Sequence, residues 1–373
     1  MTAEPFRSKL AALEQRGRLR SLAPRAGRDF ASNDYLGLAG DPIIAGAVAD
    51  AIDRGVPVGS GGSRLLRGNA PEHEGLEAKA ADFFRTQAAL FLANGYVGNL
   101  ALFSTLPQPG DLIVADELIH ASAHDGIRMG RAAAVFARHN DVQSFADLIA
   151  AFRAEGGKGR IWIAVETLYS MDGDMAPLAD LAKLAAKNEA MLLLDEAHGT
   201  GVFGPAGRGL STGLDGLHNV ITLHTCGKGM GVEGALLCGP RVHLDFLINR
   251  ARPFIYSTAP SPLMAVAASA AIDRIEGAGD LRSRLQTLRQ DAAEAICAPL
   301  GLPVPRSQIL PVILGDDART MAAAVTLQAA GFDVRGIRPP TVPSGTSRLR
   351  ISLTLNVGRA DVAALGQALK AAI

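Results

Sequence analysis

The stretch from Met191 to Gly231, MLLLDEAHGTGVFGPAGRGLSTGLDGLHNVITLHTCGKGMG, decides how the rest of this chain is interpreted. An apolar run at 191–194 ends on Asp195, and a second run at 220–223 leads toward Lys228. Both runs are typical of buried strands. Because ligands bind at the carboxyl ends of the strands in α/β proteins, we expect Asp195 and Lys228 to face one site.

A carboxylate and an amine placed in this way suit pyridoxal phosphate. This cofactor needs a Lys that forms a Schiff base and an acidic group beside its pyridine nitrogen. His198, three residues after Asp195, is placed to contact the same ring. On these residues alone, the Asp is also typical of a helix cap or of a metal or nucleotide ligand, and the glycine-flanked Lys is also typical of a loop.

Strand-like and helix-like segments alternate over the first two thirds of the chain. The predicted strands lie at residues 89–93, 112–116, 133–137, 161–167, 191–195, 220–224 and 235–239. Strands at this spacing with helices between them predict an α/β fold whose mostly parallel sheet is covered on both faces. The segment from Gly234 to Gly239 is a candidate antiparallel insertion.

The pattern differs at the two ends of the chain. Residues 6–22 predict a solvated helix, whereas an Ala-rich helical region at 261–300 precedes strand-like segments and a terminal helix at 361–372. The C-terminal pattern predicts a smaller α+β domain with its own sheet. We therefore expect three parts, which are an N-terminal helix and arm (1–45), a large domain (46–257) and a small domain (258–373).

Composition excludes several classes of protein. Lys and Arg number 37, as do Asp and Glu, so no overall charge favours nucleic acid or an anionic membrane. No apolar run approaches the ~20 residues that span a bilayer, and the charged first 20 residues are not a secretory signal. The three cysteines lack metal-ligand spacing, and their odd number indicates a reducing compartment. We expect a cytoplasmic protein with no metal.

Four motifs resemble those of the α-oxoamine synthases, a family of fold-type I pyridoxal-phosphate enzymes. They are LLLDEAHGTGVFGPAGRG at 192–209, LHTCGKGMG at 223–231, SMDGD at 170–174 and IRPPTVPSGTSRLR at 337–350. The resemblance extends from about Leu19 to the C-terminus. It implies a PLP-dependent acyltransferase in which Lys228 carries the cofactor and acts as a base, and Asp195 pairs with the pyridine nitrogen.

The resemblance also assigns further cofactor contacts. It implies that His120 stacks on the cofactor ring and that Ser170 and His198 bind its phenolic oxygen. A set of small or polar residues is expected at the phosphate, namely Gly95, Tyr96, Thr225, Ser257 and Thr258. The last two would come from the neighbouring subunit, which implies an obligatory homodimer.

For Gly95 and Tyr96, the residues themselves support two interpretations. ANGYVGN at 93–99 follows a predicted strand and opens a helix, whose free N–H groups and dipole favour an anion. An ordinary strand-to-helix turn has the same pattern. The family match favours the phosphate site.

Substrate carboxylates call for arginine, whose planar guanidinium binds them through two hydrogen bonds. The resemblance assigns Arg350 and Asn33 to the amino-acid carboxylate, and Arg20, Arg338 and Thr341 to the acyl donor. From the strand pattern alone, Arg350 could instead lie on an exposed edge face, where we also expect Arg348.

Within the family, the resemblance points to the members that condense L-alanine with a pimeloyl thioester, carried by CoA or acyl carrier protein, in biotin biosynthesis. A sibling such as 2-amino-3-oxobutyrate CoA ligase is the alternative. Leu65 stands where 5-aminolaevulinate synthases have Asn, which counts against succinyl-CoA. A non-catalytic cofactor-binding protein is disfavoured because Lys228, Asp195, His120 and Arg350 are all present.

Overall fold

The computed structural model describes residues 3–22 and 24–373. Its main feature is a seven-stranded sheet in the order β2-β8-β7-β6-β5-β3-β4. The strands are β2 (Ala88–Leu92), β3 (Leu112–Asp116), β4 (Ala133–Ala137), β5 (Ile161–Glu166), β6 (Met191–Asp195), β7 (Val220–Thr225) and β8 (Ala235–Gly239). β7, β6, β5, β3 and β4 run parallel, and β8 is antiparallel to both of its neighbours. The predicted parallel sheet and the antiparallel insertion are therefore confirmed.

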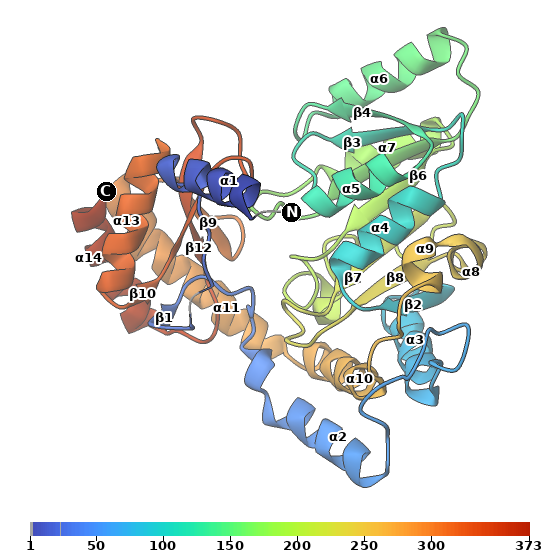
Figure 1. The fold of residues 1–373 in the computed structure, drawn as a ribbon, viewed down its shortest axis with the longest axis horizontal. Helices are drawn as coiled ribbons and strands as arrows, with labels where there is room; N and C mark the ends of the chain where they lie inside the picture. Colours follow the sequence, from blue (N-terminus) through green and yellow to red (C-terminus); the bar gives the residue numbers. More distant parts are fainter. Residues whose placement is uncertain (1–2, 23) are drawn as a thin grey trace.

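Helices cover both faces of this sheet (Figure 1). Successive side chains of β5 point to opposite faces, as a strand requires. Trp162 and Ala164 pack with one group of helices, whereas Ile163 and Val165 pack with the other. The first group is α4 (Gly95–Thr105), α5 (Ala121–Met129), α8 (Arg241–Arg250) and α9 (Arg252–Ile255), and the second is α6 (Val142–Ala154) and α7 (Leu178–Lys187).

The C-terminal part has a separate sheet in the order β11-β12-β9 (Figure 1). Both pairings in it are antiparallel. Its elements are β9 (Ile309–Gly315), β11 (Arg335–Ile337) and β12 (Ser347–Ser352), with α11 (Gly279–Ala292), a π-helical turn (Ala293–Cys297), α12 (Ala298–Leu300), α13 (Asp317–Ala329) and α14 (Arg359–Ala372). The predicted α+β character of this part is confirmed.

The N-terminal arm joins the C-terminal part. β1 (Arg28–Asp29) pairs in parallel with β10 (Phe332–Asp333). α1 (Glu4–Gln15) has no buried residue, in agreement with a solvated helix, but the prediction that it extends to residue 22 is wrong. Gly17 takes a left-handed conformation with φ of +62°, and this conformation ends helices.

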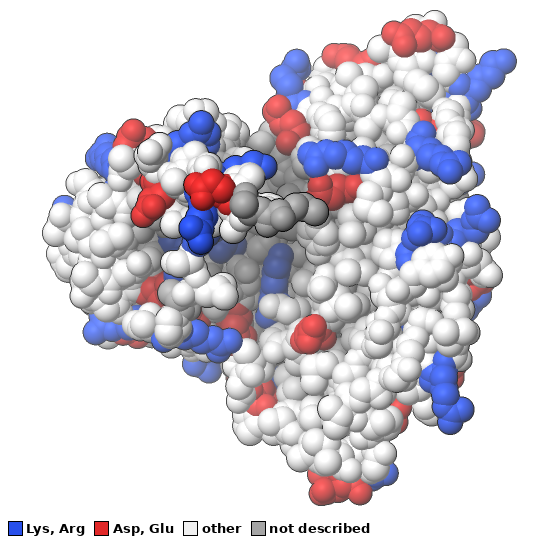
Figure 2. All heavy atoms as spheres, in the orientation of Figure 1, with Lys and Arg blue, Asp and Glu red and all other residues white. Residues whose placement is uncertain are grey.

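α10 (Pro262–Glu276) precedes the C-terminal part in the chain. It packs against α2 (Pro42–Asp53) and α3 (Pro71–Phe83). In the space-filling view, the molecule is hollowed between the C-terminal part and the large sheet, and acidic and basic side chains are interspersed on this face (Figure 2). No helix among residues 3–22 and 24–373 is long and apolar enough to cross a membrane. The three-part division expected from the sequence stays a prediction.

Candidate active site

The register of the large sheet brings acidic and basic side chains to one edge. Glu166 at the end of β5 pairs with Asp195 at the end of β6, and Asp195 pairs with Leu223 of β7. Lys228 lies in the turn that follows β7, so the same sheet edge carries its amine. As expected from the sequence, the carboxyl ends of these strands gather the charged groups.

Lys228 begins a chain of hydrogen bonds. Its Nζ donates to His198 Nε2 at 2.8 Å, and His198 Nδ1 lies 2.5 Å from the Tyr35 hydroxyl. The Tyr35 hydroxyl donates to Asn33 Oδ1 at 3.0 Å, which assigns the His198 proton to Nδ1. Burial lowers the pKa of His198 well below its ordinary value, with help from the charges of Lys228 and Arg350, so the ring is neutral. A neutral ring with this tautomer accepts the hydrogen bond from Lys228 at Nε2.

Burial also lowers the pKa of Lys228, to about 8. The negative charge of Asp195 acts in the opposite direction, and the charge of Arg350 adds to the lowering. An amine with this pKa is partly neutral near pH 7, as a catalytic base must be.

Asp195 is buried and is held by two donors. Its Oδ1 accepts from Ala197 N at 2.9 Å, and its Oδ2 accepts from Asn99 Nδ2 at 2.9 Å. Asn99 also donates to Ser122 Oγ at 2.9 Å, and Ser122 Oγ lies 2.7 Å from His120 Nδ1. His120 caps the N-terminus of α5, and its side chain is exposed. Asn99 and Ser122 therefore link the Asp195 carboxylate to the exposed His120.

Glu166 differs from Asp195, although the two are register partners. Its side chain is fully enclosed, its Oε2 accepts from Ser170 N at 3.2 Å, and its Oε1 has no partner among the described residues. Burial and the nearby charge of Asp195 together raise the pKa of Glu166 to about 8, against a smaller lowering by the charge of Lys228. Glu166 is therefore a neutral acid at pH 7.

The start of α4 brings a helix N-terminus and a hydroxyl group together. Gly95 is the first residue of the helix, and a Cβ at this position would lie 2.6 Å from Thr225 Oγ1. Only glycine allows the Thr225 hydroxyl to lie this close to the helix N-terminus. Tyr96 follows with 45% of its surface exposed, and its hydroxyl donates to Asp125. A hydroxyl group beside the N–H groups of a helix N-terminus is typical of a phosphate site.

Arg350 on β12 is buried and faces the large domain. Its Nη2 donates to Asn33 Oδ1 at 3.1 Å, and its Nε donates to the Ser170 carbonyl at 2.6 Å. Arg348 is also buried and pairs with Asp172, so the expectation of an exposed face is wrong. The reason is that β12 is the central strand of its sheet, between β11 and β9.

Other predicted residues lie outside this cluster in the single chain. Arg20 is exposed between α1 and β1, and Arg338 donates from Nη1 to Met321 Sδ at 2.7 Å. Three further residues are exposed, namely Ser257, Thr258 and Thr341. Within the described ranges, no hydrogen bond joins Ser170 to His198.

Three residues of the cluster were missed by the sequence analysis. Tyr35 links Asn33 to His198, Asn99 holds Asp195, and Glu166 supports the backbone of Ser170. Two of them carried a signal in the sequence. Asn99 lies one helical turn after Gly95, and Glu166 ends a buried strand as Asp195 does.

Comparison with known proteins identifies the family. The model of the aminotransferase class I and II family matches residues 27–368. The chain belongs to this family. An 8-amino-7-oxononanoate synthase from Anaeromyxobacter dehalogenans strain 2CP-1 is 42% identical over 364 residues, which cover 93% of this chain and 90% of that protein. A putative 8-amino-7-oxononanoate synthase from Parvibaculum lavamentivorans is 39% identical over 98% of this chain and 92% of its own length.

Solved structures show the same fold. Serine palmitoyltransferase K265A from S. paucimobilis with a bound PLP-myriocin aldimine matches with a TM-score of 0.89 and 27% identity, over 99% of this chain and 97% of that chain. The 8-amino-7-oxononanoate synthase from Francisella tularensis matches with a TM-score of 0.77 and 29% identity, over 93% and 96%. The prediction of a fold-type I enzyme related to the α-oxoamine synthases is confirmed.

Proposed function

We propose that this chain catalyses the reaction of an 8-amino-7-oxononanoate synthase. L-alanine and a pimeloyl thioester would give 8-amino-7-oxononanoate, CO2 and the free thiol carrier, in biotin biosynthesis. The names of its relatives support this reaction. The observation that carries it is a continuous chain of hydrogen bonds from the Lys228 amine to the Arg350 guanidinium, through His198, Tyr35 and Asn33.

The residues present fit pyridoxal phosphate. Lys228 offers a partly neutral amine, and Asp195 offers a carboxylate on the neighbouring strand. The Thr225 hydroxyl beside the N-terminus of α4 suits hydrogen bonds to the phosphate, and the exposed His120 suits stacking on the pyridine. When bound, the cofactor stabilises negative charge at the amino acid Cα.

The chain's own side chains supply binding and proton transfer. Arg350 binds the α-carboxylate of alanine, because its guanidinium is buried, charged and already oriented by Asn33 and Ser170. Lys228 Nζ takes the proton from the alanine Cα and returns a proton to the product. His198 orients the amine by accepting its hydrogen bond, and Asn99 keeps Asp195 in place.

The acyl side and the assembly belong to the same proposal. Arg20, Arg338 and Thr341 would bind the thioester, whose carrier is CoA or acyl carrier protein. Ser257 and Thr258 are exposed in the single chain, which suits a contact to the cofactor phosphate of the partner in a homodimer. The three cysteines are free and buried, in keeping with a cytoplasmic location.

A product assay tests the function. The protein is loaded with pyridoxal phosphate and incubated with L-alanine, glycine or L-serine, each with acetyl-CoA, pimeloyl-CoA or palmitoyl-CoA, and the products are identified by mass spectrometry. We expect 8-amino-7-oxononanoate from alanine and pimeloyl-CoA as the dominant product. A preference for glycine and acetyl-CoA would instead indicate 2-amino-3-oxobutyrate CoA ligase activity.

A further inference from the structure

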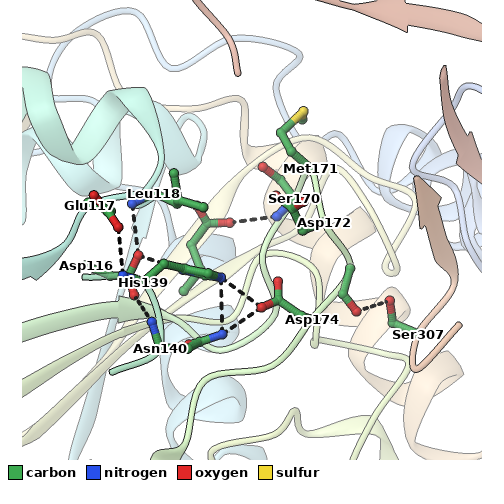
Figure 3. A network of polar contacts seen from close by, with 12 residues as sticks. Asp116, Glu117, Leu118, His139, Asn140, Ser170, Met171, Asp172, Asp174 and Ser307 are labelled. Carbon is green, nitrogen blue, oxygen red and sulfur yellow. Dashed lines mark hydrogen bonds and ion pairs between the residues drawn. The ribbon is translucent and has the colours of Figure 1, made fainter. Parts of the chain in front are cut away.

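A second group of polar side chains lies beside the loop at residues 167–175 (Figure 3). The loop leaves β5 and folds back on itself, with Tyr169 N donating to Asp174 O at 2.9 Å and Gly173 N donating to Tyr169 O at 2.9 Å. Ser170 lies in this loop, and its carbonyl accepts from Arg350 Nε. The position of the loop therefore bears directly on the position of Arg350.

The C-terminal part holds one side of this loop. Besides the Arg350 contact, Ser307 Oγ donates to Gly173 O at 2.7 Å (Figure 3). Arg348 pairs with Asp172. These partners come from residues 307–350. On their own, they would leave the loop to follow the C-terminal part rather than the large sheet.

His139 holds the other side of the loop. It lies just after β4, and its Nδ1 donates to Asp116 Oδ1 at 2.9 Å while its Nε2 donates to Asp174 Oδ2 at 2.8 Å. Asn140 spans the same pair, with its N donating to Asp116 Oδ2 at 2.8 Å and its Nδ2 donating to Asp174 Oδ2 at 2.7 Å. The ring of Tyr169 packs edge-on at 4.4 Å from the His139 ring centroid. Asp174 is thus tied to Asp116, a fully buried residue at the end of β3.

The two shortest contacts of the ring favour a protonated His139. Nδ1 lies 2.9 Å from Asp116 Oδ1, and Nε2 lies 2.8 Å from Asp174 Oδ2 and 3.2 Å from Asn140 Nδ2. Carboxylate oxygens accept hydrogen bonds, so a proton on both nitrogens satisfies the two shorter contacts. Burial alone would lower the pKa of His139, but the hydrogen bonds to Asp116 and Asp174 raise it to about 10. The Glu117 carboxylate accepts from His139 N at 2.9 Å and adds a further negative group.

The backbone at this point is arranged for the contact. Asn140 has a φ of +54°, in the left-handed region that a non-glycine residue takes only at a cost. Its main-chain N and its side chain reach Asp116 and Asp174 from this conformation. Asn140 and the His139 ring therefore form hydrogen bonds with the same two carboxylates.

We propose that His139 is a positioning residue, which holds the 167–175 loop against the large sheet and thereby places Arg350 for the substrate carboxylate. This inference rests on the proposed function of Arg350. Lys228 and Asp195 depend instead on β6, β7 and Asn99, and they share no hydrogen bond with His139 among the described residues. Loss of the His139 contact should therefore impair amino-acid binding more than the chemical step.

The experiment compares His139→Gln with His243→Gln in the full-length protein. Gln at 139 is neutral and reaches only one of the two carboxylates. His243 is a matched control, because it is also partly buried and edge-on to an aromatic ring, that of Trp162, but lies at the opposite end of the strands. We expect the KM for L-alanine to rise about tenfold or more in His139→Gln, as loss of a charge-assisted hydrogen bond would produce, with a smaller change in kcat. His243→Gln should match the wild type.

A second measurement does not depend on activity. Hydrogen exchange of the backbone amides in segment 167–175, measured in the same variants without substrate, should be faster in His139→Gln and unchanged in His243→Gln. Faster exchange in His139→Gln, together with a wild-type protein that does not use alanine, would overturn the proposed function but keep the role of His139 in holding the loop. Unchanged exchange, or an unchanged KM despite faster exchange, would overturn the positioning role. If His139→Gln does not fold, Asp174→Asn, which removes the charge of the same contact, gives both readouts.

Discussion

The two halves of the candidate site are held in different ways. Glu166 and Asp195 end neighbouring strands whose backbone ladder fixes their spacing, and Lys228 lies in the turn after the next strand, β7. Arg350 and Asn33 come from the C-terminal sheet and the N-terminal arm, and they reach the site through side-chain hydrogen bonds. The comparison teaches that the proposed reactive groups lie at one sheet edge, whereas the proposed binding groups for the substrate carboxylate come from separate parts of the chain. Loss of Lys228 or Asp195 should lower kcat, and changes in the second half should raise KM.

Removal of the amine should have the largest effect. In Lys228→Ala we expect kcat to fall by at least about a thousandfold, because we propose this residue as both the cofactor attachment point and the base. Steady-state turnover of alanine and pimeloyl-CoA measures it. Lys183→Ala is the control, since Lys183 is exposed and pairs only with Asp180 one turn away. Wild-type turnover in Lys228→Ala would refute the assignment.

The two acids of the strand ends should respond differently. Asp195→Asn should lower kcat about 100-fold to 1,000-fold, as expected for loss of one preorganised charge. Glu166→Gln should change kcat by no more than about fivefold, because the acid is already neutral at pH 7 and the amide keeps the contact to Ser170. Equal losses of kcat in Asp195→Asn and Glu166→Gln would contradict the proposal that Asp195 acts as a charge and Glu166 as a neutral acid.

Arg350 tests the recognition half. In Arg350→Lys we expect the KM for L-alanine to rise about 10-fold to 100-fold with a smaller change in kcat, because an ammonium group cannot form the planar pair of hydrogen bonds. Arg335→Lys is the control, since Arg335 is the register partner of Arg350 on β11 but is exposed. A fall in kcat at constant KM would place Arg350 in the chemical step instead.

The smallest effect is on stability and comes from Glu166. Its folded pKa of about 8 lies above its ordinary value of 4.5, so between these values the folded protein holds a proton that the unfolded chain releases. The contribution of Glu166 is therefore fully present below pH 4.5 and is lost as the pH rises to about 8. Urea unfolding of cofactor-free protein should show that Glu166→Gln loses less stability than the wild type over this window. Parallel curves for the two proteins would contradict the raised pKa.

The sequence predicted most of the fold because its signals are local. Strand and helix periods located the sheet, and the apolar run at 235–239 indicated the antiparallel strand. The end of α1 was misjudged because the amphipathic pattern continues past Gly17, where the backbone turns left-handed. The burial of Arg348 was misjudged because strand order, which sequence periodicity does not contain, makes β12 the central strand.

The site was predicted unevenly for the same reason. Asp195 and Lys228 stand at strand ends that can be located along the chain. The links made by Tyr35 and Asn99 depend on contacts between segments far apart in sequence, 163 and 96 positions from their partners His198 and Asp195. No local pattern encodes such a contact.

The most direct test of the account is to identify the lysine that binds the cofactor. Protein loaded with pyridoxal phosphate is reduced with sodium borohydride, which makes a bond between a lysine and the cofactor permanent, and is then digested and analysed by mass spectrometry. The account predicts a pyridoxyl group on Lys228. A label on another lysine, or no label, would contradict it.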